Sequence, residues 1–211
     1  FDEGAGITSP FFTAWNALVF KAEVGPGETI LVHGGAGGVG MAAIQLAKRF
    51  GCRVLTTVSS DEKEAFCRSM GADETINYSE EDFAERVQEI TDGKGVPVVY
   101  ESIGKDTYEK SMDCLENFGM LVNFGNASGA IPAIEPLELM RRGSLALSRP
   151  TLFNYTSDPA MRQTAAQALF DIVASGKVKI EIGQTFPLAD VAAAHTALES
   201  RQTTGSTVLI P

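Results

Sequence analysis

The run GAGGVG at residues 35–40 has the glycine spacing G-x-G-x-x-G. Its side chains offer no charge and no hydrogen-bonding group, so any chemistry here belongs to the backbone. The run follows an apolar, β-branched segment, Thr29–Gly34, and precedes a stretch with helical periodicity, Val39–Phe50. Between a strand and a helix, this spacing is typical of a loop that binds a dinucleotide pyrophosphate at the helix N-terminus.

The three glycines of the spacing have different expected roles. Gly35 permits the tight turn, Gly37 lets the backbone approach a pyrophosphate, and Gly40 lets the helix pack closely on the strand. The alternative interpretation is a plain turn between a strand and a helix.

The end of the next predicted strand, about 20 residues after the glycine loop, usually has an acidic residue in NAD sites. This sequence has Ser59 there, and Lys63 follows in the first turn of the helix predicted over Glu62–Met70. A carboxylate would repel a 2′-phosphate, whereas a hydroxyl can donate to it. The helix dipole disfavours a cation in a first turn unless an anion is near. The pattern therefore favours NADP over NAD.

Both residues also have structural interpretations. Ser59 and Glu62 match the capping box S-x-x-E, which satisfies backbone groups at a helix start. Lys63 can be a solvated surface lysine, and Asp61 with Glu62 weakens the attraction for a phosphate. These alternatives stay open at the level of sequence.

Strand-like and helix-like segments alternate around these residues. Beyond the first strand, strands are predicted over Arg53–Ser59, Glu74–Asn77, Val96–Ser102, Gly119–Asn126 and Gly143–Arg149. Further helices are predicted over Ile7–Phe20, Ser79–Thr91, Lys105–Asn117, Pro159–Ser175 and Leu188–Ser200. This alternation predicts an α/β fold, a doubly wound parallel six-stranded Rossmann sheet with helices on both faces.

Composition excludes several classes of protein. The 211 residues have a formal net charge of -10, which argues against strong nucleic-acid binding. No apolar stretch approaches the roughly 20 residues of a membrane helix. Three cysteines and two histidines give neither a disulfide framework nor a convincing zinc site, and they predict a reducing, cytoplasmic location.

Six segments occur in the order of a known family: VHGGAGGVGMAAIQLAK, GADETINY, VVYESIG, LVNFGNASG, SRPTL and ESRQTTGSTVLIP. Together they resemble the NADPH-dependent quinone oxidoreductases, which are zinc-free members of the medium-chain dehydrogenase/reductase superfamily related to zeta-crystallin. The resemblance covers essentially the whole chain. It implies transfer of a hydride or electrons from NADPH to a quinone, independent of zinc.

The resemblance also implies a domain organisation. It places a linking helix at 1–20, the Rossmann domain at 21–150, and a helix and strand packed on it at 151–185. Residues 186–211 would be a return segment that completes a GroES-like catalytic domain, and that domain is expected to be absent here. The family dimerises near the predicted edge strand 143–149, so a homodimer is expected.

At the nicotinamide end of the cofactor, the resemblance implies Thr13 and Asn16 on the linking helix, although the family more often has an aromatic residue at position 16. After the fifth strand it implies Phe124, Gly125 and Asn126. The other implied contacts are the backbone of Gly38 and Val39 at the pyrophosphate, Ser59, Ser60 and Lys63 at the 2′-phosphate, Tyr78 at the adenosine, Ser102 or Ile103 over the cofactor, and Arg149 and Arg201 completing the pocket.

Each implied contact has a structural alternative. Tyr78 can cap a strand, Gly125 and Asn126 can form a plain turn, and Arg149 and Arg201 can be surface arginines. His33 is expected to be a satisfied core histidine, and His195 a structural residue on its helix. No catalytic residue is assigned, because the nicotinamide itself performs hydride transfer. The alternatives to a quinone reductase are an NADPH-binding module without turnover and an NADPH-dependent enone or alkene reductase.

Overall fold

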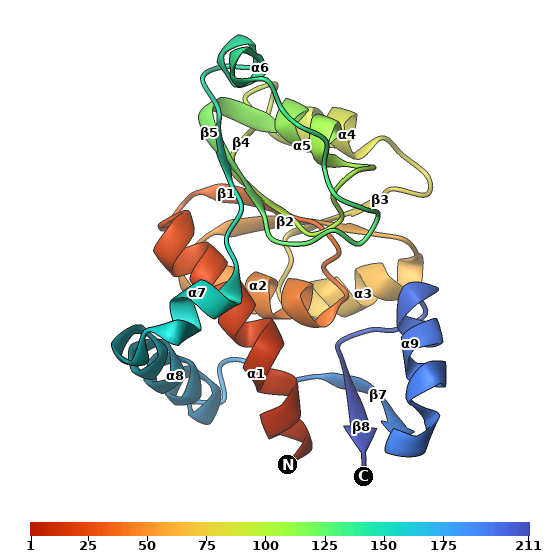
Figure 1. The fold of residues 1–211 in the computed structure, drawn as a ribbon. Coiled ribbons are helices and arrows are strands. Elements are labelled where there is room, and N and C mark those ends of the chain that lie inside the picture. The colour runs from red at the N-terminus through yellow and green to blue at the C-terminus, as the bar shows by residue number, and fades with distance from the viewer.

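A computed structural model describes the backbone of residues 1–211 and every side chain except those of Phe20 and Lys21. Its main sheet has six parallel strands in the order β3-β2-β1-β4-β5-β6 (Figure 1). The strands are β1 Thr29–Val32, β2 Arg53–Val58, β3 Glu74–Asn77, β4 Val96–Glu101, β5 Leu115–Asn123 and β6 Ala146–Ser148. The strand order reverses between β1 and β4, where doubly wound sheets bind their ligands. The predicted fold class is confirmed.

Helices cover both faces of this sheet (Figure 1). One face packs against α1 (Asp2–Trp15), α2 (Gly38–Arg49) and α3 (Asp61–Ser69), and the other against α4 (Phe83–Ile90) and α5 (Tyr108–Asp113). Successive residues of β1 point to opposite faces, so Ile30 and Val32 join the first core and Leu31 joins the second. A strand buried on both faces must be apolar throughout, which explains the continuous hydrophobic run that predicted it.

Two predicted boundaries around β5 are wrong. The helix predicted over Lys105–Asn117 ends at Asp113, and β5 begins at Leu115 rather than Gly119. Leu115 is buried and pairs with Val96, so the chain has already joined the sheet at that point. The short helices α6 (Pro136–Arg141) and α7 (Leu152–Ser157) were not predicted.

The helix predicted over Ile7–Phe20 begins earlier than expected, as α1 from Asp2, and ends as the π-helical segment η1 (Asn16–Lys21). After α8 (Pro159–Ala174), the chain forms β7 (Ile182–Pro187), η2 (Leu188–Asp190), α9 (Val191–Glu199) and β8 (Ser206–Ile210). β7 and β8 form a separate parallel pair beside α1. Between them, the Gly205 N–H donates to the Ala36 carbonyl at 2.7 Å, which ties this C-terminal unit to the glycine loop.

Candidate functional site

Close backbone approaches shape the glycine loop between β1 and α2. A Cβ on Gly40 would lie 2.2 Å from the Gly34 carbonyl oxygen, so Gly40 allows the close packing predicted for it. The tight turn, however, lies at Gly34, whose φ is +66°, and the role predicted for Gly35 is wrong. Gly35 is required because a Cβ there would lie 2.2 Å from Thr56 Oγ1 on β2.

The start of α2 can accept an anion. Gly37 is its N-cap, no described side chain caps it, and its first turn contains no acidic residue. A Cβ on exposed Gly37 would meet only the Gly34 carbonyl oxygen, at 3.5 Å, so the backbone there is open to a ligand. Gly38 lies against Pro10 and Ser206, and the Val39 side chain packs on the core. The Gly37 N–H itself donates to the Gly34 carbonyl at 3.1 Å, so what this turn offers a ligand on its open side is the partial positive charge of the α2 N-terminus.

One cavity beside the loop brings together residues from four strand ends and from α9. Its volume is about 210 Å³, and the predicted site residues that line it are Gly37, Ser59, Lys63, Tyr78, Ser102, Ile103 and Arg201. Tyr78, Ile103 and Arg201 also line an adjoining cavity of about 550 Å³. Thr57 and Thr203 line the first cavity as well and were not predicted, although Thr57 lies just before Ser59 near the end of β2.

Among the described residues, Lys63 and Arg201 are the two cationic residues that line the first cavity. Lys63 Nζ donates to Ser59 Oγ at 3.3 Å and to the Arg201 carbonyl oxygen at 2.5 Å. The residue that caps α3 is Ser60, whose Oγ accepts the Lys63 N–H at 3.4 Å. The capping-box interpretation of Ser59 is therefore wrong, and its hydroxyl is left to face the cavity beside the lysine.

A second cavity of about 540 Å³ contains the residues predicted for the other end of the ligand. Thr13, Asn16, Phe124 and Arg149 line it together with α7. The Asn16 amide donates to the Phe12 carbonyl at 2.7 Å, but its buried Oδ1 has no hydrogen-bond partner among the described residues. Leaving a buried acceptor without a donor lowers the stability of the fold, and the N–H of a ligand amide can supply the missing hydrogen bond.

The loops after β4 and β5 touch between these cavities. A Cβ on Gly125 would lie 2.4 Å from the Ser102 carbonyl oxygen, so only glycine fits there. Arg149 Nη1 donates to the Asn123 carbonyl at 3.2 Å, and Asn126, with its amide oriented to satisfy its neighbours, accepts from Arg149 Nη2 at 3.2 Å. Arg149 is exposed, as its surface interpretation expects, and through these bonds it braces the end of β5.

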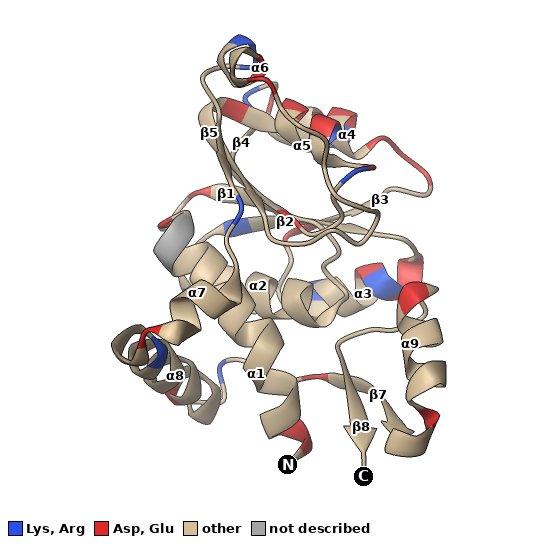
Figure 2. Ribbon diagram, viewed as in Figure 1, with Lys and Arg blue, Asp and Glu red and all other residues tan. Residues whose placement is uncertain are grey.

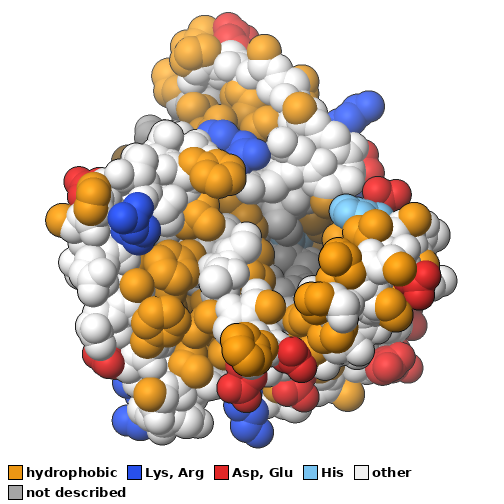
Figure 3. Space-filling view, turned by 60° about the horizontal axis from the view of Figure 1, so that its bottom comes forward, with side chains coloured by type: hydrophobic (Ala, Val, Ile, Leu, Met, Phe, Trp, Pro, Cys, Tyr) orange, Lys and Arg blue, Asp and Glu red, His pale blue; other side chains and the backbone are white. Residues whose placement is uncertain are grey.

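The shape and charge of this region agree with an elongated anionic ligand. Acidic residues gather around α4 and the loop before it (Figure 2), and the first turn of α3 is acidic as well. Lys63 and Arg201 are therefore the local cations of the first cavity in a chain of net charge -10. Figure 3 shows the face that α1, α9 and the C-terminal strands present, with a hollow bordered by apolar side chains. The uncapped turn of α2, Lys63 and the buried Asn16 acceptor fit a dinucleotide phosphate, a 2′-phosphate and a nicotinamide amide respectively.

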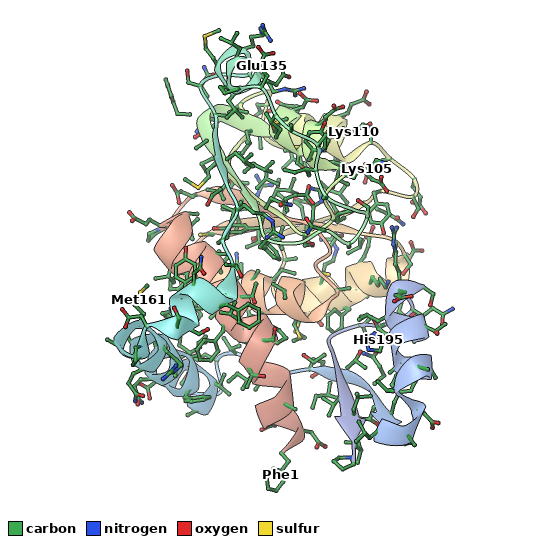
Figure 4. All side chains as sticks on the ribbon, viewed as in Figure 1. Phe1, Lys105, Lys110, Glu135, Met161 and His195 are labelled. Atoms are coloured by element: carbon green, nitrogen blue, oxygen red, sulfur yellow. The ribbon has the colours of Figure 1, made fainter. Side chains whose placement is uncertain are left out.

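His33 is a satisfied core histidine, as predicted. It is 2% exposed, and its ring nitrogens lie 2.9 Å from Thr57 Oγ1 and 2.9 Å from Ser111 Oγ. The other histidine, His195, is exposed on α9 (Figure 4). Burial lowers the pKa of His33, and the negative charge of Glu101 offsets this only in part.

The lowered pKa of His33 predicts a pH dependence of stability. Below its ordinary value of 6.5, the unfolded chain binds a proton that the folded chain does not, so stability falls as pH falls from 6.5. The expected slope is at most about 1.4 kcal/mol per pH unit, measured by urea unfolding between pH 6.5 and 5.5. His33→Gln should lose this slope, and His195→Gln should keep it. Equal slopes in wild type and His33→Gln would contradict the prediction.

Among the described residues, no group of three or more His, Cys, Asp and Glu side chains is arranged to hold a metal ion. None of the helices whose residues are described is long and apolar enough to cross a membrane. The three cysteines are free and buried. Burial raises the pKa of the Cys67 thiol to about 12, so this thiol stays protonated and unreactive at neutral pH.

Comparisons with known proteins agree with this geometry. A family model described as zinc-binding dehydrogenase matches residues 38–176. A quinone oxidoreductase of Pseudomonas aeruginosa is 48% identical, over 100% of this chain and 65% of its own length. A 2-haloacrylate reductase of Burkholderia sp is 45% identical, over 98% of this chain and 62% of its own length. Escherichia coli quinone oxidoreductase complexed with NADPH superposes with a TM-score of 0.97 at 42% identity, over 100% of this chain and 65% of that one. The chain thus spans less than two thirds of each relative.

Proposed function

The chain belongs to the zinc-binding dehydrogenase family, and we propose that it supplies the NADPH-binding domain of a quinone oxidoreductase. The observation that carries the proposal is the pair of Lys63 Nζ and Ser59 Oγ, 3.3 Å apart in the cavity beside the uncapped start of α2. The names of the 48% identical relative and of the superposed NADPH complex support it.

When bound, NADPH would supply the hydride, and the residues of this chain would bind and orient it. The turn at Gly37 would hold the pyrophosphate through backbone N–H groups, as helix N-termini hold phosphates. Asn16 Oδ1 would accept from the nicotinamide amide, and Phe124 would line the same cavity. Arg149, through Asn123 and Asn126, would keep the β5 loop in place at that end.

Discrimination between NADPH and NADH would depend on charge. A 2′-phosphate beside the Lys63 ammonium and the Ser59 hydroxyl gains charge-assisted hydrogen bonds, which are about twice as strong as neutral ones. No carboxylate takes the place of Ser59 to accept from a free 2′-hydroxyl. Ser60, by contrast, would contribute through its cap of α3, which fixes the Lys63 backbone.

The proposed function is tested by titrating NADPH and NADH into the chain and following nicotinamide fluorescence. We expect NADPH to bind more tightly than NADH. Absence of NADPH binding would contradict the cofactor assignment, and equal affinities would contradict the role of Ser59 and Lys63.

Substrate class is tested by NADPH oxidation with a quinone, with an enone and with a 2-haloacrylate. One relative is named as a 2-haloacrylate reductase, and a 2-haloacrylate is an alkene, so an alkene substrate is the second candidate. Oxidation with the quinone alone supports the first proposal, and oxidation with the alkenes alone supports the second. NADPH binding without oxidation of any of them would indicate a binding module.

We also propose that the protein is a cytoplasmic, zinc-independent homodimer that pairs through β6. β6 is an edge strand of the described sheet, and an exposed edge can pair with another chain. Buried free thiols suit a reducing compartment. Chelation of zinc by EDTA is expected to leave NADPH affinity unchanged.

The dimer predicts a particle of twice the 22.5 kDa chain mass in sedimentation equilibrium. Phe118 is 80% exposed, and its N–H donates to the Gly143 carbonyl just before β6, so Phe118→Asn is expected to weaken association. Asparagine tolerates the φ of +68° at this position. Phe153→Asn is the matched control, because Phe153 is 81% exposed on α7. A monomer, or equal weakening by both substitutions, would contradict the interface.

A further inference from the structure

A line of buried hydrogen bonds connects the glycine loop with the loop after β4. The Gly34 N–H donates to Thr57 Oγ1 at 3.2 Å, and Thr57 Oγ1 lies 2.9 Å from His33 Nδ1. On the other side of the ring, His33 Nε2 lies 2.9 Å from Ser111 Oγ, which donates to Glu101 Oε2 at 2.6 Å. We call these five residues the His33 relay. They come from the ends of β1, β2 and β4 and from α5.

Glu101 forms the far end of the relay and holds the loop that lines the first cavity. Its carboxylate is completely buried, and Oε1 accepts the Ile103 N–H at 2.6 Å and the Gly104 N–H at 3.0 Å. Oε2 also accepts the Thr107 hydroxyl at 2.9 Å. A buried carboxylate needs such donors, and here they fix the backbone of Ile103 over the cavity.

Counting protons gives the relay a direction. The single proton of Ser111 goes to Glu101, so Ser111 Oγ accepts from His33 Nε2–H. A neutral ring then has Nδ1 as an acceptor, which takes the proton of Thr57 Oγ1. Thr57 in turn accepts from Gly34. The opposite direction would need a protonated Glu101, and it would leave the Thr57 hydroxyl proton with no acceptor among the described residues.

Each member therefore depends on the next. Ser111 is completely buried, so water cannot replace a lost partner there, and Thr57 is 1% exposed where it borders the first cavity. Gly34 is also the residue with the left-handed φ at the turn, and Thr57 holds its N–H in that turn. The His33 ring packs edge-on against Phe83 at 4.9 Å between centroids, which fixes the plane in which both nitrogens bond.

We propose that the His33 relay sets the position of the glycine loop relative to the loop after β4, with His33 as the neutral Nε2–H tautomer. His33, Thr57 and Ser111 are thus positioning residues for cofactor binding, a role that rests on the proposed function. None of them needs to touch the cofactor, because they act through the backbone of Gly34 and Ile103.

The tautomer is tested on the chain without ligand by ¹⁵N NMR of the histidine rings. The relay requires a protonated Nε2 and an unprotonated Nδ1 at pH 7 for His33. His195 gives the second ring signal and is identified with His195→Gln. A protonated Nδ1 at pH 7, in either a neutral or a charged ring, would overturn the proposal.

Loop position is tested by amide hydrogen exchange, again without ligand. Thr57→Val and Ser111→Ala are expected to speed exchange at Gly34–Gly37 at least tenfold relative to the amides of α8. The Ser111 result carries the most weight, because the Ser111 hydroxyl does not bond the glycine loop directly and has His33 and Glu101 as its partners. Thr57→Ser keeps the hydroxyl and should keep exchange slow. If Thr57→Val does not fold, Ser111→Ala alone provides the disrupted relay.

Thr75→Val is the matched control for these variants. Thr75 is also a buried strand threonine with one hydroxyl hydrogen bond, to Glu64 at 3.0 Å, but it lies outside the relay. It should leave exchange at Gly34–Gly37 unchanged. The double variant Thr57→Val/Ser111→Ala should exchange no faster than the faster single variant, because the relay is already broken. Unchanged exchange in Ser111→Ala would overturn the relay.

Cofactor binding is tested last, by NADPH titration of the same variants. Thr57→Val and Ser111→Ala should raise the NADPH Kd about tenfold, while Thr57→Ser and Thr75→Val stay near wild type. If wild type binds no NADPH, the proposed function fails, while exchange and NMR still decide the relay. If wild type binds but Ser111→Ala binds equally well, the positioning role is overturned and the proposed function stands.

Discussion

Replacement of Gly40 by alanine is expected to destabilise the protein by about 3 kcal/mol and to abolish NADPH binding. The added Cβ would lie 2.2 Å from the Gly34 carbonyl oxygen and 2.6 Å from Gly35 Cα. Both are backbone atoms at the end of β1, so no rotation of a side chain can relieve the overlap. Either α2 moves away from the sheet or the loop changes shape. Urea unfolding followed by circular dichroism measures the loss.

Gly4→Ala is the matched control for this substitution. Gly4 lies in α1, and a Cβ added there would have no neighbouring atom within 4 Å, so alanine meets no obstacle. Since alanine is the better helix former, the variant should gain about 0.5–1 kcal/mol and bind NADPH as wild type does. A Gly40→Ala protein with the stability and affinity of Gly4→Ala would show that the close approach at Gly40 is not needed.

Lys63→Ala is expected to raise the Kd for NADPH about 10- to 100-fold and to leave the Kd for NADH nearly unchanged. Only NADPH carries the 2′-phosphate that the ammonium would pair with. A hydrogen bond to a charged group contributes about 1.5–3 kcal/mol, which corresponds to that range of affinity. Fluorescence titrations with both nucleotides measure the difference, and the effect should shrink at high salt because the side chain is only partly buried.

Lys177→Ala is the control for a general loss of positive charge. Lys177 is exposed and lies next to the cavity between α2 and the end of α8, outside the proposed site. Its removal should change neither affinity. Equal weakening of NADPH and NADH by Lys63→Ala would instead mean that the lysine acts through the Arg201 carbonyl, by holding the C-terminal unit in place.

Most of the sheet could be predicted because β1 to β4 are short runs rich in β-branched residues between turn residues. β3 was predicted to the residue, and β1 and β2 were predicted with one or two extra residues at their carboxyl ends. The prediction failed where local signals compete. Leu115 continues the apolar pattern of α5, yet its pairing with β4 places it in a strand. Helices of six residues, such as α6 and α7, have too few turns for a periodic pattern.

The candidate site was predictable in outline, because the carboxyl ends of parallel strands meet at one edge of the sheet. Finer assignments depend on geometry that sequence does not contain. Two adjacent serines, Ser59 and Ser60, can each cap α3, and only the backbone decides between them. His33 was expected to be satisfied, but its partners Thr57 and Ser111 lie 24 and 78 residues away and have no sequence signature.

The pairing of Gly37 with Gly205 has a consequence for how the protein is made. Ser206, next to it, also donates to the Gly6 carbonyl of α1, so α1 and β8 meet beside the glycine loop. A ribosome releases all six strands of the large sheet before it releases Gly205. Contacts of such long sequence separation form late, because the chain between them must first be ordered. The contact between the glycine loop and Gly205 therefore forms only after the whole large sheet has been synthesised.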